Sequence, residues 1–122
     1  MAYPNKAALA DKYYGCQLVD VSTASIAYLP IVAQGVIVDA WAAISAGLTT
    51  ANGTVTIKKG STTLGTITLT QSGSAAGSTF QASFTASEAN RSVVAGDVIL
   101  FDSDGACDTT SIGVFTLVVR EL

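Results

Sequence analysis

The chain has 122 residues, of which 49% are hydrophobic and only 12% are charged. A chain of this size buries enough apolar surface to fold as one domain without a metal or a disulfide. The net charge is −3 and the six lysines and arginines are scattered, which argues against binding to nucleic acid. No apolar run reaches the roughly 20 residues that a membrane span needs. No signal-peptide pattern stands near the first residue, so we expect synthesis in a cytoplasm.

The first residues predict an N-terminal arm at 1–15, followed by a single β-sandwich domain at 16–122. Segment 6–14 is compatible with one or two helical turns that end at Gly15. Aromatic side chains on a terminal segment often bind a neighbour, because they offer a large contact area at a low entropy cost. Packing on their own domain is the other interpretation, and both stay open. The arm contains Tyr3, Pro4, Leu9, Tyr13 and Tyr14.

From Cys16 onward, short apolar runs alternate with turn residues. The segments 54–58 and 64–70 alternate apolar with threonine or lysine side chains around a turn at 60–62, which predicts a β-hairpin. Ser87 begins a short predicted helical turn. About eight strands with regular turns predict an all-β, antiparallel sandwich of the jelly-roll type. We expect these strands at residues 18–21, 26–29, 35–45, 54–58, 64–70, 80–84, 98–101 and 112–119.

The period-two pattern also assigns the core. The predicted core residues are Val55, Ile57, Ile67, Leu69, Phe84, Val98 and Leu100. The long strand at 35–45 is expected to place Val36, Val38, Ala40 and Ile44 on one face, and Ile37, Asp39 and Trp41 on the other. The strands at 98–101 and 114–119 are apolar on both faces. We therefore expect a loop, the arm or a partner to cover their outer sides.

Histidine is absent from the chain, which excludes Ser–His and Cys–His nucleophile pairs and histidine-ligated metals. The spacing of the aspartates and glutamates singles out no carboxylate pair for glycoside hydrolysis. We therefore expect neither an enzyme nor a bound cofactor. Cys16 and Cys107 are too far apart in sequence for a metal motif, and free thiols are favoured over a disulfide.

The one acidic cluster is the loop at 102–108. Asp102, Asp104 and Asp108 resemble the start of a calcium loop, but the further ligand and the distal glutamate of an EF-hand are missing. Aspartate and glycine also form ordinary turns through side-chain to backbone hydrogen bonds. The sequence favours the structural turn over a calcium site.

Asp39 and Trp41 are further candidates for contact with a partner. An acidic side chain in mid-strand must face solvent or be paired. Asp39 is therefore either a contact with a basic partner or an ordinary exposed residue. Trp41 with Tyr28 is the aromatic pair that a sugar-binding platform would use.

Five segments carry a resemblance to a known family. An N-terminal arm precedes the strand Gly-Val-Ile-Val-Asp-Ala-Trp at 35–41, and the hairpin Thr-Val-Thr-Ile-Lys-Lys-Gly-Ser follows at 54–61. The segment Val-Ala-Gly-Asp-Val-Ile-Leu-Phe at 94–101 then leads to an apolar closing strand. In this order of segments, over most of its length, the chain resembles the small decoration, or cement, proteins of tailed-bacteriophage capsids.

The resemblance implies a jelly-roll-like structural protein without catalysis or cofactor. Such a protein is made in the host bacterial cytoplasm, binds the major capsid protein on the capsid exterior, bridges neighbouring capsomers and stabilises the shell. Self-association as a dimer or trimer is expected, with no nucleic-acid or membrane partner. The alternative is a carbohydrate- or receptor-binding module of a phage fibre or adhesin. The predicted partner-binding residues are Tyr3, Pro4, Leu9, Tyr13, Tyr14, Asp39 and Trp41.

Overall fold

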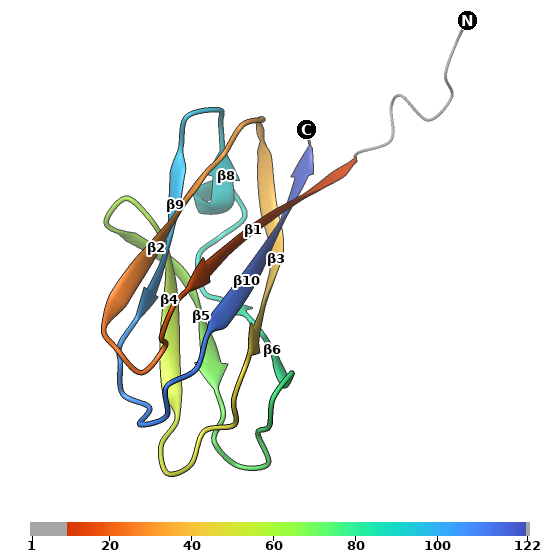
Figure 1. The fold of residues 1–122 in the computed structure, drawn as a ribbon. Coiled ribbons are helices and arrows are strands. Elements are labelled where there is room, and N and C mark those ends of the chain that lie inside the picture. The colour runs from red at the N-terminus through yellow and green to blue at the C-terminus, as the bar shows by residue number, and fades with distance from the viewer. Residues whose placement is uncertain (1–9, 122) are drawn as a thin grey trace, which may run out of the picture.

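The computed structural model describes residues 10–121, which form two five-stranded antiparallel sheets packed face to face (Figure 1). Sheet A has the order β1 (Asp11–Leu18), β10 (Gly113–Glu121), β3 (Gly35–Ile44) and β6 (Thr79–Gln81), with β8 (Ser92–Val93) also paired to β3. Sheet B has the order β2 (Ser25–Pro30), β9 (Val98–Ser103), β4 (Gly53–Lys59), β5 (Thr62–Leu69) and β7 (Ser83–Phe84). The predicted all-β sandwich is confirmed, with ten strands in place of about eight.

The hairpin of β4 and β5 forms as predicted, because its alternation leaves one face apolar. Val55 pairs with Ile67 across the two strands, and both side chains are fully buried. Ile57 and Leu69 are buried on the same inner face, while the threonines point outward. The turn passes through Gly60, whose φ of +62° lies in the left-handed region that glycine adopts without strain.

The predicted inner face of β9 is wrong. Ile99 and Phe101 are fully buried, whereas Val98 is 39% exposed and Leu100 is half-buried. The strand is apolar on both faces, so alternation alone does not select the inner one. The ring of Phe101 stacks on that of Phe115 with centroids 5.0 Å apart, which places the larger side chain between the sheets.

β1 begins earlier than the sequence predicted. Residues 11–15 lie in β1 and pair with β10 from Asp11↔Arg120 onward, in contrast to the expected arm with helical turns. Tyr14 and Cys16 pack against the core from this strand. Residues 11–15 are a strand because they pair with β10, which is distant in sequence, so no local pattern separates them from a terminal arm. Residues 1–9 lie outside the part of the chain that the structure describes.

A β-bulge in β3 overturns part of the predicted alternation. Val119 of β10 pairs with Ile37 and Val118 pairs with Asp39, so Val38 is an extra residue on β3. The bulge changes which residues face inward: Ile37 is fully buried, contrary to prediction, and Val38 is not. Downstream of the bulge the predicted alternation holds, with Trp41 outward and the neighbouring alanines buried.

The predicted strand at 80–84 is split between the two sheets. β6 pairs with β3 of sheet A and β7 pairs with β5 of sheet B, so the chain crosses at this edge of the sandwich (Figure 1). Phe84, a predicted core residue, is half-buried and packs against the core from its edge strand. The predicted helical turn is the 3₁₀ segment η2 (Ala89–Arg91). Arg91 then donates to the backbone carbonyl of Ile37, beside the bulge, and its guanidinium lies 5.3 Å from the ring centroid of Phe84.

Cys16 and Cys107 are free thiols, as predicted. Burial raises the pKa of Cys16 to about 11 and also raises the pKa of Cys107. Both thiols are therefore protonated near neutral pH. In the described part of the chain, no helix is long and apolar enough to cross a membrane.

Candidate partner-binding surface

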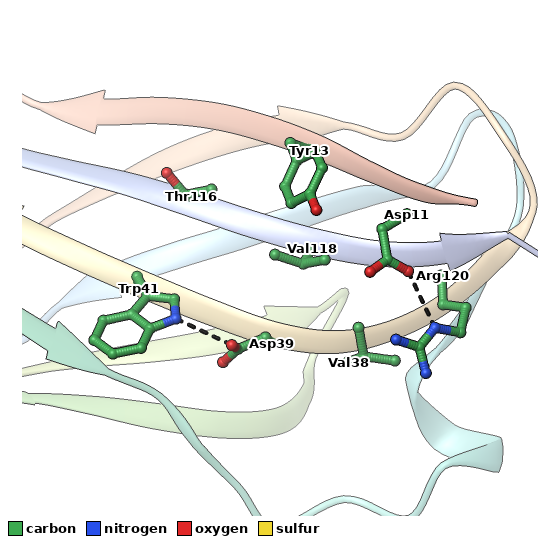
Figure 2. A pocket seen from close by; sticks show the side chains of 8 residues that line it. All are labelled: Asp11, Tyr13, Val38, Asp39, Trp41, Thr116, Val118 and Arg120. Atoms are coloured by element: carbon green, nitrogen blue, oxygen red, sulfur yellow. Dashed lines mark hydrogen bonds and ion pairs between the residues drawn. The ribbon is translucent and has the colours of Figure 1, made fainter. Parts of the chain in front are cut away.

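A shallow depression with a volume of about 580 Å³ lies on the outer face of sheet A, where β1, β10 and β3 run side by side (Figure 2). We call this depression the outer hollow. Its side chains come from three strands that are distant in sequence but adjacent in the sheet. The residues that line it are Asp11, Tyr13, Val38, Asp39, Trp41, Thr116, Val118 and Arg120.

The pairing register places two aromatic rings on either side of β10 (Figure 2). Tyr13 on β1 pairs with Val118, and Trp41 on β3 pairs with Thr116. Tyr13 is 71% exposed and Trp41 is 40% exposed. On the β1 side, Thr116 faces Gly15, which carries no side chain. The centre of the hollow is therefore low and its two sides are aromatic.

The ring of Trp41 is held in place by its neighbours. Its Nε1–H donates to Oδ2 of Asp39 at 3.0 Å. Asp39 also accepts from the amide of Gln81 on β6, at 3.1 Å and 3.3 Å, and from the backbone N–H of Ala40 at 2.9 Å. Asp39 is thus paired with donors of its own sheet, and it orients an exposed indole.

The opposite end of the hollow carries an ion pair. Nε of Arg120 donates to Oδ1 of Asp11 at 3.0 Å. This hydrogen bond, with the charge of Asp11, raises the pKa of the Arg120 guanidinium above its usual value. The pair is exposed to solvent, so it contributes little to stability. It gives this end of the hollow hydrogen-bonding groups with little net charge.

The chemistry of the outer hollow favours binding. Aromatic side chains that keep part of their surface in water are the side chains most enriched at protein interfaces. Its two carboxylates, Asp11 and Asp39, each accept hydrogen bonds from donors of the protein.

Three of the predicted partner-binding residues meet in the outer hollow: Tyr13, Asp39 and Trp41. Tyr14 does not, because its ring packs against the core and its hydroxyl accepts a 3.4 Å hydrogen bond from the N–H of Val32. The predicted pairing of Trp41 with Tyr28 does not form, since β2 places Tyr28 on the outer face of sheet B. Tyr3, Pro4 and Leu9 lie outside the described residues.

Sequence reasoning missed the other residues of the hollow. Thr116 and Val118 occupy outward positions of a strand that is apolar on both faces, and no local signal marks them as a site. Val38 reaches the hollow through the bulge. Asp11 and Arg120 are joined only by the pairing of the first and last strands.

The acidic loop forms a structural turn. Asp104 accepts from the backbone N–H groups of Thr54 and Ala106, and Asp102 forms an ion pair with Lys58 at 3.0 Å. Asp108 accepts hydrogen bonds from Thr49 and Thr50, which lie in another loop. The three carboxylates thus have different partners. Among residues 10–121, no group of three or more His, Cys, Asp or Glu side chains could hold a metal ion.

No protein-family model matches the sequence, and no curated protein matches it. Among solved structures, the chain is similar to a chain of the "Cyanophage Pam1 capsid asymmetric unit", with a TM-score of 0.54 and 12% sequence identity. The superposition covers 100% of this chain and 93% of that chain. At this level of identity the likeness shows the fold alone, and it extends over the whole β-sandwich.

Proposed function

We propose that this protein is a structural virion protein that binds the outer surface of a phage capsid and stabilises the shell. The observation that carries the proposal is the likeness in fold to a chain of a cyanophage capsid asymmetric unit. Since the match covers 100% of one chain and 93% of the other, the two chains are also similar in length. A domain this small fits an accessory subunit that attaches to a shell built by a larger protein.

The outer hollow is the surface that we assign to the capsid contact. Tyr13 and Trp41 supply the large, exposed rings that dominate binding energy at protein interfaces. Asp39 already fixes the indole, so less side-chain entropy is lost on binding. Only 12% of the residues are charged, and this low content of charged side chains favours close packing against a neighbouring protein.

The N-terminal arm extends this contact in the proposal. Asp11, the first residue of β1, lies at the edge of the outer hollow. Residues 1–9 therefore join the domain beside the proposed capsid contact. Tyr3, Pro4 and Leu9 would add apolar contact area to that of Tyr13 and Trp41. In the proposal, the arm binds one capsid subunit and the outer hollow binds the neighbouring capsid subunit. This bridge between capsomers would stabilise the shell.

The proposal is tested with capsids of the phage that encodes the protein, prepared without it. We expect saturable co-sedimentation of the purified protein with these particles, and a higher temperature of heat-induced genome release. Tyr13→Ser should weaken binding by at least about tenfold, because this exposed ring is an anchor. Val19→Ser, at a position 80% exposed outside the hollow, is the control and should bind normally. Absence of binding by the unmodified protein would refute the proposal.

A carbohydrate-binding module is the second candidate function, and the two rings of the outer hollow favour it. Tyr13 and Trp41 flank the hollow, and the Asp11–Arg120 pair supplies polar groups that could bond to sugar hydroxyls. A glycan array separates the candidates. Binding to a defined glycan that Tyr13→Ser abolishes, with no binding to capsids, would replace the capsid proposal with this one.

A further inference from the structure

We infer that the outer face of sheet B binds a second copy of this chain about a two-fold axis. The surface lies on β2 and β9, on the opposite side of the sandwich from the outer hollow. We call it the β2–β9 patch. Its members are Ile26, Tyr28, Pro30, Val98 and Leu100. The inference does not rest on attachment to a capsid.

The register between the two strands makes the patch continuous. Tyr28 pairs with Leu100, and Pro30 pairs with Val98. Ile26 follows at the next outward position of β2. Tyr28 is 64% exposed, and the other members are exposed or half-buried. β9 is thus apolar on both faces, and residues 10–121 leave its outer face accessible.

The size of the patch fits a small dimer interface. Five such side chains expose on the order of 300–500 Å², within the range of the largest apolar patches of soluble proteins, which often mark binding sites. A stable interface buries roughly 800 Å² on each partner. The polar residues beside the patch, Thr56 and Lys58 on β4 and Asp102 on β9, would form part of the polar rim of such an interface.

The charges beside the patch favour a second copy as the partner. Lys58 and Asp102 form an ion pair at 3.0 Å next to the apolar side chains. This ion pair adds no net charge to the rim, so at this position two identical faces meet without net repulsion even though the chain has a net charge of −3. A two-fold interface uses the same patch on both subunits, and a patch of balanced charge is complementary to itself.

The experiment is sedimentation equilibrium of the purified full chain over roughly 1–100 µM, a range that resolves micromolar dissociation constants. We expect a monomer–dimer equilibrium for the unmodified protein. Tyr28→Ser should raise the dissociation constant at least tenfold, and Val98→Thr, a change of similar shape, should raise it to a smaller extent. Tyr13→Ser is the matched control: it removes a tyrosine of similar exposure from the opposite face and should leave the dimer intact.

Thermal unfolding of each variant shows whether it still folds. If Tyr28→Ser fails to fold, Val98→Thr still tests the inference. A monomer over the whole range, or a trimer, would overturn the inference. So would a dimer that Tyr13→Ser weakens as much as Tyr28→Ser does. None of these readouts involves capsids, so the outcome is independent of whether the proposed function holds.

Discussion

Gly65 shows how a single absent side chain sets the packing between β5 and β7. A Cβ atom at this position would lie 2.5 Å from the carbonyl oxygen of Ser83 and 2.8 Å from Cα of Phe84. Both obstacles are backbone atoms, so the strands would have to move apart. We expect Gly65→Ala to lower the free energy of unfolding by about 1–3 kcal/mol, as overpacking of a core does.

Gly15→Ala is the matched control for this prediction. Its Cβ would meet only the carbonyl oxygen of Phe115, at an ordinary 3.7 Å, on the exposed face of β1. We expect the stability of this variant to stay within about 0.5 kcal/mol of the unmodified protein, as at most surface positions. Chemical denaturation measures the free energy of unfolding of both variants. Equal losses would contradict the claim that close contact with the backbone of β7 makes Gly65 necessary for stability.

Asp108 ties two loops together and makes stability depend on pH. Hydrogen bonds from Thr50, followed by those from Thr49, lower the pKa of its carboxyl below the ordinary 3.8. A carboxyl whose pKa is lower in the folded state stabilises the protein fully above its unfolded pKa. This stabilisation is lost as the pH falls from about 3.8 through the folded pKa.

We therefore expect Asp108→Asn to unfold at a lower temperature than the unmodified protein at pH 7, with the difference shrinking below about pH 4. Thermal unfolding followed by circular dichroism between pH 7 and pH 2.5 measures this. Glu88→Gln, at the exposed N-cap of η2, is the control and should unfold at pH 7 at nearly the same temperature as the unmodified protein. A constant difference across the whole pH range would contradict the assignment to the Asp108 carboxylate.

At the scale of the element, the bulge at Val38 decides which side chains of β3 enter the core. Deletion of Val38 leaves Ile37 paired with Val119 and Asp39 paired with Val118, in regular alternation. We expect this variant to fold, with a loss of stability of at most about 2 kcal/mol, because no side chain changes face. It should lose affinity for the partner of the outer hollow, which Val38 lines.

Deletion of Ala40 is the informative comparison. The strand could keep its register beyond Trp41 only by moving Asp39 into the buried position of Ala40. Burial of an unpaired carboxylate costs several kcal/mol, so we expect this variant to unfold or to lose most of its stability. If a denaturant titration showed the same loss of stability for both deletions, the bulge would not determine which side chains of β3 face the core.

The strands differ in how far the sequence predicts them. The β4–β5 hairpin was predicted with its inner face, because Val55, Ile57, Ile67 and Leu69 alternate strictly with polar residues. The inner face of β9 could not be selected locally, since stacking of Phe101 on Phe115 depends on a strand from the other sheet. The bulge in β3 left no local mark, because Ile37 and Val38 are equally apolar.

The candidate site was predictable only in part for the same physical reason. Asp39 and Trp41 lie two residues apart on one strand, so alternation alone places them on one face. The sequence marks Tyr13 as an aromatic residue of the terminal arm that binds a neighbour or packs on its own domain. Its position beside Val118 depends on pairing between the first and last strands. The Asp11–Arg120 ion pair joins residues at opposite ends of the chain, which no local pattern reveals.

At the scale of the whole molecule, the two outer faces of the sandwich carry different chemistry. Sheet A presents aromatic rings with fixed polar neighbours in the outer hollow. Sheet B presents the β2–β9 patch beside a single ion pair. In the two proposals, the domain contacts a shell through one outer face and its own copy through the other. This arrangement relates the proposed capsid attachment to the inferred dimer.

Cryo-electron microscopy of the virions to which the proposed function assigns this protein is the decisive experiment. We expect density for the two-sheet domain on the exterior of the shell, with Tyr13 and Trp41 in contact with the major capsid protein. A particle whose shell carries no such domain, or one in which the outer hollow faces solvent, would contradict it.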